Sequence, residues 1–167
     1  MLKSLARAGL VAAMFAAIPA VAQAQMGPDA AACRAGRPSM LVTVNGFSQR
    51  TGNVRVAIYG SNPAQFLERG QTLRKIDLPV SRGAGPMRIC VALPGPGQYA
   101  VAVRHDLDGN GRSGWNDGGG FSRNPRISLV NLRPRYQNVA VNVGQGTLGV
   151  NVTLLYRYGL SIRPANG

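Results

Sequence analysis

In the stretch 106–117 of this 167-residue chain, the first, third and fifth residues have acidic or amide side chains. The stretch fits a loop template in which positions 1, 3, 5, 7 and 12 supply oxygen ligands to Ca²⁺. Gly111 falls at position 6 of this template, where a glycine permits the sharp turn. The ligands predicted in this way are Asp106, Asp108, Asn110, Arg112 through its carbonyl oxygen, and Asp117. Because hard oxygen ligands favour Ca²⁺ over a transition metal, the spacing predicts a weak calcium site.

The same stretch also has a purely structural interpretation. Asp and Asn side chains accept hydrogen bonds from their own backbone in Asx-turns, which stabilise hairpin loops without any ion. Asp117 is shorter than the glutamate usual at position 12, and Arg104, Arg112 and Arg123 lie close enough in sequence to repel a dication. The two interpretations differ in geometry, because the ligand oxygens converge on one point only in the first.

Catalytic chemistry has little support in the sequence. His105 is the single histidine, and a hydrolase would need it as the base beside a nucleophile. It continues the alternating face formed by Tyr99, Val101 and Val103, so a buried position at a strand end is expected. We therefore predict that the protein is not an enzyme, with a hydrolase using His105 as a distant alternative. Trp115 could stack on a sugar or simply anchor the loop.

Period-2 alternation of apolar residues dominates the rest of the chain and predicts short strands. Turn signals such as Asn45-Gly46 and the Pro-Gly repeat at 94–97 separate them. One short helix is expected over 64–69, capped by Asn62. The predicted strands cover 41–45, 54–58, 73–80, 87–93, 99–104, 139–143 and 148–158. About seven strands with this spacing predict an all-β fold, a single antiparallel β-sandwich of immunoglobulin or transthyretin type, with a closed barrel as the alternative.

The N-terminus has the three parts of a cleavable secretory signal peptide. Lys3 and Arg7 form the positive region, an uncharged apolar run follows, and small residues precede a cleavage site after Ala24. We expect a signal peptide over 1–24, an extended or disordered segment over 25–38, the sandwich over 39–160 and a tail over 161–167. The protein is then periplasmic or extracellular, with no transmembrane segment in its mature part.

The expected export determines how the cysteines and the net charge are interpreted. Cys33 and Cys90 are the two cysteines, and an oxidising compartment makes a disulfide between them the expected state, with two free thiols as the alternative. The net charge is +13, with almost all of it from arginine. Such a charge favours anionic partners of the cell envelope, glycan or lipid, unless it reflects base composition alone. Nucleic acid is not expected, because no basic run with interleaved aromatics is present.

Several motifs in this chain resemble the signature of a family of uncharacterised exported bacterial proteins, a domain of unknown function. The resemblance covers about 41–156 and implies an exported β-sandwich with no assigned activity. After Gly111 this chain has Ser113-Gly114 where the family tends to carry Leu-Asp. The matching motifs are Leu93-Pro94, 97–103, 105–111, 120–124 and 134–136. We accordingly expect a non-enzymatic binding or structural module, with a Ca²⁺ loop as the only nameable site.

Overall fold

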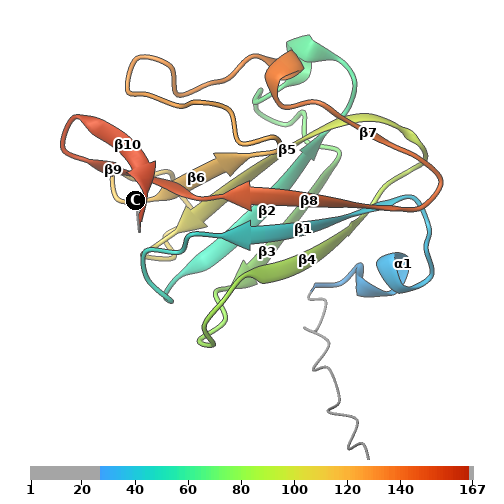
Figure 1. The fold of residues 1–167 in the computed structure, drawn as a ribbon, viewed down its shortest axis with the longest axis horizontal. Helices are drawn as coiled ribbons and strands as arrows, with labels where there is room; N and C mark the ends of the chain where they lie inside the picture. Colours follow the sequence, from blue (N-terminus) through green and yellow to red (C-terminus); the bar gives the residue numbers. More distant parts are fainter. Residues whose placement is uncertain (1–26, 166–167) are drawn as a thin grey trace, which may run out of the picture.

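The computed structural model describes residues 27–165 and shows two β-sheets packed face to face (Figure 1). The expected signal peptide, 1–24, lies outside the described residues. None of the helices in the described part of the chain is long and apolar enough to cross a bilayer. The mostly-β, sandwich-like architecture predicted from the alternation is confirmed.

The first sheet has three strands in the order β4-β1-β8. Strand β1 (Ser39–Asn45) pairs antiparallel with β4 (Met87–Ala92) and parallel with β8 (Thr147–Thr153). The parallel pair departs from the purely antiparallel sandwich that was predicted. A period-2 pattern specifies which face of a strand is buried but not its direction, so the sequence could not reveal this pair.

The second sheet has the order β10-β9-β6-β5-β2-β3, with β7 paired to one end of β5. Its longest strand, β5, leads directly into the Asp-rich loop, and β6 returns from that loop antiparallel to β5. The strands are β2 (Asn53–Tyr59), β3 (Arg74–Pro79), β5 (Gly97–Asp106), β6 (Gly118–Phe121), β7 (Val141–Val143), β9 (Leu155–Tyr158) and β10 (Ser161–Pro164).

The core between the sheets consists mainly of the alternating apolar residues of the predicted strands, together with Met40, which lies just before the first predicted strand. Each strand contributes one face, and burial of these aliphatic side chains is the main stabilising contribution. Fully buried examples are Met40, Val42, Val44, Val54, Val56, Ile58, Met87, Ile89, Val91 and Val101. A second cluster on the outer face of the second sheet includes Phe66, Tyr136 and Val139. This cluster fixes the long segment 122–140 against the sheet.

Several predicted boundaries are corrected by the structure. The expected single strand over 148–158 is two strands in different sheets, because the chain crosses between the layers at Leu154, whose N–H donates to the Asn45 carbonyl. Since both sheets face one core, the apolar alternation continues across this break. The expected tail, 161–167, contains β10, which pairs with β9.

The two short helical segments also differ from expectation. The segment 25–38, expected to be extended or disordered, contains α1 (Ala30–Arg34), which packs on β4; residues 25 and 26 lie outside the described range. The expected helix over 64–69 is a single 3₁₀ turn, η1 (Pro63–Gln65), and Asn62 caps it by accepting from the Ala64 N–H. A second 3₁₀ turn, η2 (Tyr136–Asn138), precedes β7.

Candidate functional site

The Asp-rich loop connects β5 to β6 at one end of the second sheet. Its base is held closely, because Gly52 lies against the backbone of Asp106 with a φ of +68°. A Cβ placed on Gly52 would come within 1.9 Å of the Asp106 carbonyl oxygen, so only glycine fits there. The turn between β1 and β2 therefore fixes where the loop begins.

Three carboxylates gather in this loop. One ligand oxygen from each of Asp106, Asp108 and Asp117 lies within 4.8 Å of the others. The whole chain has only six acidic residues. The other three, Asp29, Glu68 and Asp77, are each ion-paired with an arginine elsewhere. Half of the negative side chains of a strongly basic protein are thus concentrated at one point.

The loop side chains also accept hydrogen bonds from the loop backbone. Asp108 accepts from the Asn110 N–H at 3.1 Å, and Asn110 accepts from the Arg112 N–H at 2.7 Å. Asp117 accepts from the N–H groups of Leu107 and Gly114. The Asp108 and Asn110 bonds are the Asx-turn bonds of the structural interpretation, whereas Asp117 bonds backbone groups that precede it. Each ionised carboxylate offers about four lone pairs, so these hydrogen bonds leave lone pairs that can bind a ligand.

Asp106 is the most buried member of the cluster, with its side chain 5% exposed. Its Oδ2 accepts from the Gly111 N–H at 2.8 Å and lies 3.6 Å from Arg104 Nη2. Its Oδ1 is buried and has no hydrogen-bond partner among the described residues. Burial alone would raise the pKa of Asp106, but the hydrogen bond from the Gly111 N–H and the Arg104 charge help to outweigh it, so that the pKa is lowered. Asp106 is therefore ionised at neutral pH.

The sequence-predicted ligand set is only partly brought together. The structure gathers the carboxylates of Asp106, Asp108 and Asp117, as the spacing predicted. Asn110, in contrast, donates from Nδ2 to Asp108 Oδ2 at 2.6 Å, and its Oδ1 is engaged by Arg112 N–H. The metal role of Asn110 and of the Arg112 carbonyl therefore requires a small rearrangement of the turn and stays a prediction.

His105 lies in the core beneath the loop and is fully buried. Its Nε2 is 2.9 Å from the Thr51 carbonyl oxygen, and its Nδ1 is 2.7 Å from the Tyr156 hydroxyl. A carbonyl only accepts, so Nε2 carries a proton, and in the neutral imidazole Nδ1 then accepts from the Tyr156 hydroxyl. Gly118 makes room for this pair, because a Cβ there would meet the Tyr156 ring at 2.4 Å. Both ring nitrogens of His105 thus serve the structure.

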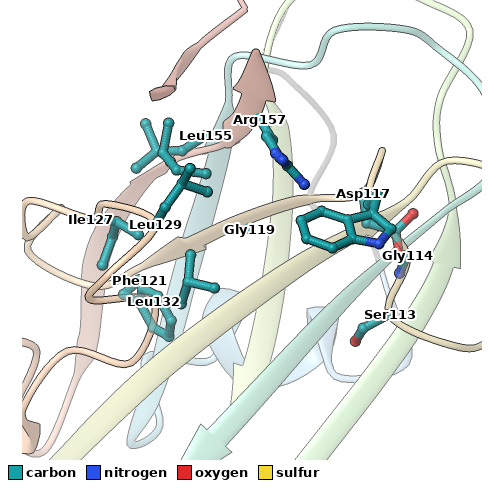
Figure 2. A pocket seen from close by; sticks show the side chains of 12 residues that line it. Ser113, Gly114, Asp117, Gly119, Phe121, Ile127, Leu129, Leu132, Leu155 and Arg157 are labelled. Atoms are coloured by element: carbon teal, nitrogen blue, oxygen red, sulfur yellow. Dashed lines mark hydrogen bonds between the residues drawn. The ribbon is translucent and has the colours of Figure 1, made fainter. Parts of the chain in front are cut away.

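Two cavities adjoin the loop, and the sequence did not reveal either. A mostly apolar cavity of about 370 Å³ and a more polar one of about 630 Å³ are separated by Trp115 and Arg157, which line both. The Arg157 guanidinium lies over the Trp115 ring, 3.9 Å from its centroid. Figure 2 shows the apolar cavity, with Leu129 and Leu155 on one side and Arg157 on the other. The tryptophan at position 115 was the sequence signal that pointed to this region.

The disulfide between Cys33 and Cys90 is formed, as predicted. It joins α1 to β4, where Cys90 faces away from the main core and packs with Ala32. Asp29 adds a second tether, since it forms an ion pair with Arg74 at 2.6 Å. The N-terminal segment is therefore fixed to the sandwich by covalent and ionic contacts.

Fold and site define a disulfide-linked β-sandwich with an Asp-rich hairpin loop and an adjoining apolar cavity. The chain belongs to DUF2141, a family described as "Uncharacterized protein conserved in bacteria", whose model matches residues 42–151. The resemblance to a domain of unknown function is thereby confirmed. Comparisons with curated proteins and with solved structures found no match.

Proposed function

We propose that this protein is an exported, non-catalytic binding module whose Asp106–Asp117 loop takes up one Ca²⁺ ion with low affinity. The observation that carries this proposal is the gathering of three carboxylates, among them a buried Asp106 whose Oδ1 has no hydrogen-bond partner within residues 27–165. A divalent cation is the ligand that such oxygens bind best. Backbone hydrogen bonds within the loop hold the carboxylates in place but supply no net positive charge.

Electrostatics favours a cation at this point. Two unit negative charges no more than 4.8 Å apart repel each other by at least about 3 kcal/mol at an effective dielectric of roughly 20. Arg104, at 3.6 Å from Asp106, offsets part of this repulsion with a single positive charge. Three carboxylates still leave an excess of negative charge, and the lowered pKa of Asp106 keeps it ionised. A bound dication removes the remaining repulsion.

The same contacts limit the affinity. Arg104 also donates to Ser113 Oγ and to the Gly111 carbonyl, each at 3.0 Å, so it stays inside the loop and opposes the ion. Asp117 already accepts two N–H groups, which it must share with the ion. We expect a dissociation constant of about 10⁻⁴–10⁻³ M, the class of extracellular calcium modules.

Two observations support the remaining parts of the proposal. Disulfides persist in oxidising compartments, so the Cys33–Cys90 bridge supports export to the periplasm or the medium. The full burial of His105, with both ring nitrogens engaged, supports a non-catalytic role because a general base must reach its substrate.

Thermal unfolding in Ca²⁺ and in chelator tests the calcium site. Ca²⁺ at ten times its dissociation constant should stabilise the folded protein by about 1.4 kcal/mol, which raises the Tm by about 5 °C for a domain of this size. Isothermal titration calorimetry should give a single site. Equal Tm values in Ca²⁺ and in chelator would show that the loop is only a structural hairpin.

A matched pair of variants assigns the effect to the loop. Asp108→Asn keeps an acceptor for the Asn110 N–H but removes one charge from the cluster, and it should abolish the Ca²⁺ shift. Asp77→Asn removes the same charge from an exposed ion pair with Arg55, outside the loop, and should leave the shift intact. A shift retained in Asp108→Asn would contradict the assignment.

A further inference from the structure

The apolar cavity beside the loop is built from segments that are far apart in the chain. It lies between the end of the Asp-rich loop, β6, the segment 125–132 and the β9–β10 hairpin. Its apolar wall consists of Phe121, Ile127, Leu129, Leu132, Leu155 and Ile162. Figure 2 shows Ile127, Leu129 and Leu132 turned toward the same space from one segment. At about 370 Å³, the cavity falls in the lower part of the range of small-molecule sites, roughly 300–1,000 Å³.

One cation stands at the edge of this cavity. Arg157 lies over the Trp115 ring, and its Nε donates to the Gly159 carbonyl at 2.8 Å. A guanidinium has five N–H donors, so this hydrogen bond leaves donors for an anion. Asp117 also lines the cavity, but its carboxylate is turned to the N–H groups of Leu107 and Gly114. The cavity therefore combines an apolar interior with a positive charge at its rim.

The segment that forms the apolar wall is held in place by polar contacts. Asn124 is bound to the end of β8, because its Oδ1 accepts from the Thr153 N–H at 2.8 Å and its Nδ2 donates to the Asn151 carbonyl. At the other end, Arg133 donates to the Leu67 carbonyl at 2.9 Å and forms an exposed ion pair with Glu68 at 2.8 Å. The cavity is thus formed before any ligand arrives, which reduces the cost of ordering on binding.

Two large apolar side chains at this cavity are left facing water. Trp115 is 75% exposed and Leu132 is 53% exposed. If each heavy-atom group fills about 30 Å³, the share of one water molecule in the liquid, the cavity holds about a dozen such groups. A saturated chain of ten carbons that ends in a carboxylate has this size and also has the required charge.

We propose that the cavity between Trp115 and Leu129 binds a single-chain amphiphilic carboxylate, with the alkyl chain among the leucine and isoleucine side chains and the carboxylate on Arg157. Burial of the ligand's alkyl chain supplies the affinity, and the ion pair between its carboxylate and Arg157 fixes the orientation of the ligand. This proposal names an anionic envelope ligand of the kind suggested by the net charge. Asp117 lines the cavity and also belongs to the proposed calcium loop, so this ligand is tested in the absence of Ca²⁺.

Decanoate, below its micelle concentration, is the probe, and Trp115 is the reporter because it is the single tryptophan of the chain. Titration in chelator excludes any contribution from Ca²⁺, so failure here and failure of the calcium site are distinguishable. We expect a saturable blue shift of the tryptophan emission with one site per chain. Absence of saturable binding by both fluorescence and calorimetry would overturn the proposal. Binding to anionic vesicles without binding of monomeric decanoate would also overturn it, in favour of a membrane-docking surface.

Variants separate the two parts of the site. Arg157→Gln should lower the affinity for decanoate about tenfold and leave the affinity for decanol, the uncharged chain of equal length, unchanged. Leu129→Ser should weaken both ligands, whereas Leu73→Ser, the same change at an exposed leucine outside the cavity, should weaken neither. An unchanged ratio of decanoate to decanol affinity in Arg157→Gln would refute the role of Arg157. Circular dichroism of each variant verifies that it is folded.

Discussion

Removing the Cys33–Cys90 bridge should lower the free energy of unfolding by about 4 kcal/mol. The bridge closes a loop with a sequence separation of 57 residues. In the chain-entropy model a loop of this length restricts the unfolded chain by about 14 cal/mol/K, which gives about 4 kcal/mol at 25 °C. The double variant Cys33→Ala/Cys90→Ala is the suitable change, because Cys90 is fully buried and alanine adds no polar atom there.

The native contacts of the N-terminal segment should survive this change. The Asp29–Arg74 ion pair and the Asp29 hydrogen bond to the Ala92 N–H still join the segment to the sandwich. The effect therefore falls mainly on the unfolded state, and reduced wild-type protein should lose nearly the same stability as the double variant. Urea unfolding measures both, and the Tm should fall by roughly 12–16 °C. A loss below about 1 kcal/mol in both proteins would refute the chain-entropy argument.

Two further predictions concern the base of the loop and the N-terminal tether. Gly118→Ala should destabilise the protein by about 1–3 kcal/mol in urea unfolding, because its Cβ displaces the Tyr156 ring; Gly119→Ala, whose Cβ meets only ordinary contacts, is the control. For Asp29, burial alone would raise the pKa, but the hydrogen bonds from the Arg74 side chain and the Ala92 N–H have the larger combined effect, so the net pKa is lowered. Its folded pKa therefore lies below its unfolded value, so its stabilising contribution is present at neutral pH and is lost as the pH falls below about 4. Between about pH 5 and pH 3 the wild type should lose more unfolding free energy than Asp29→Asn, and equal losses would contradict this.

The strands with clean alternation could be predicted from the sequence because their burial is one-sided. Residues such as Val54, Val56 and Ile58 are all fully buried, as their spacing required. Strand β6, in contrast, has three glycines in four residues and no apolar pattern. Its glycines are explained by close approach, since a Cβ on Gly120 would meet the Thr153 carbonyl at 2.6 Å. Such contacts between distant segments are invisible in a local pattern.

The carboxylate cluster could be predicted because it is local. Asp106, Asp108 and Asp117 belong to one hairpin, so their spacing alone brings them together. The apolar cavity is the opposite case, because its wall comes from β6, the segment 125–132, β9 and β10. Ile127 and Leu129 alternate as in a strand but lie in an irregular segment. They form a cavity wall only because the β9–β10 hairpin lies beside them, and the local sequence does not predict that position.

The parallel pairing of β1 with β8 has a consequence for how the molecule folds. The Ser39 hydroxyl meets the Thr147 hydroxyl across a separation of 108 residues. Because β1 lies in the middle of its sheet, one of its edges stays unpaired until nearly the whole chain has been synthesised. Pairings of such long range are slow to form, and an open edge can add a strand from another molecule. A chain that ends before β8 should therefore be aggregation-prone, even though it contains most strands of the second sheet.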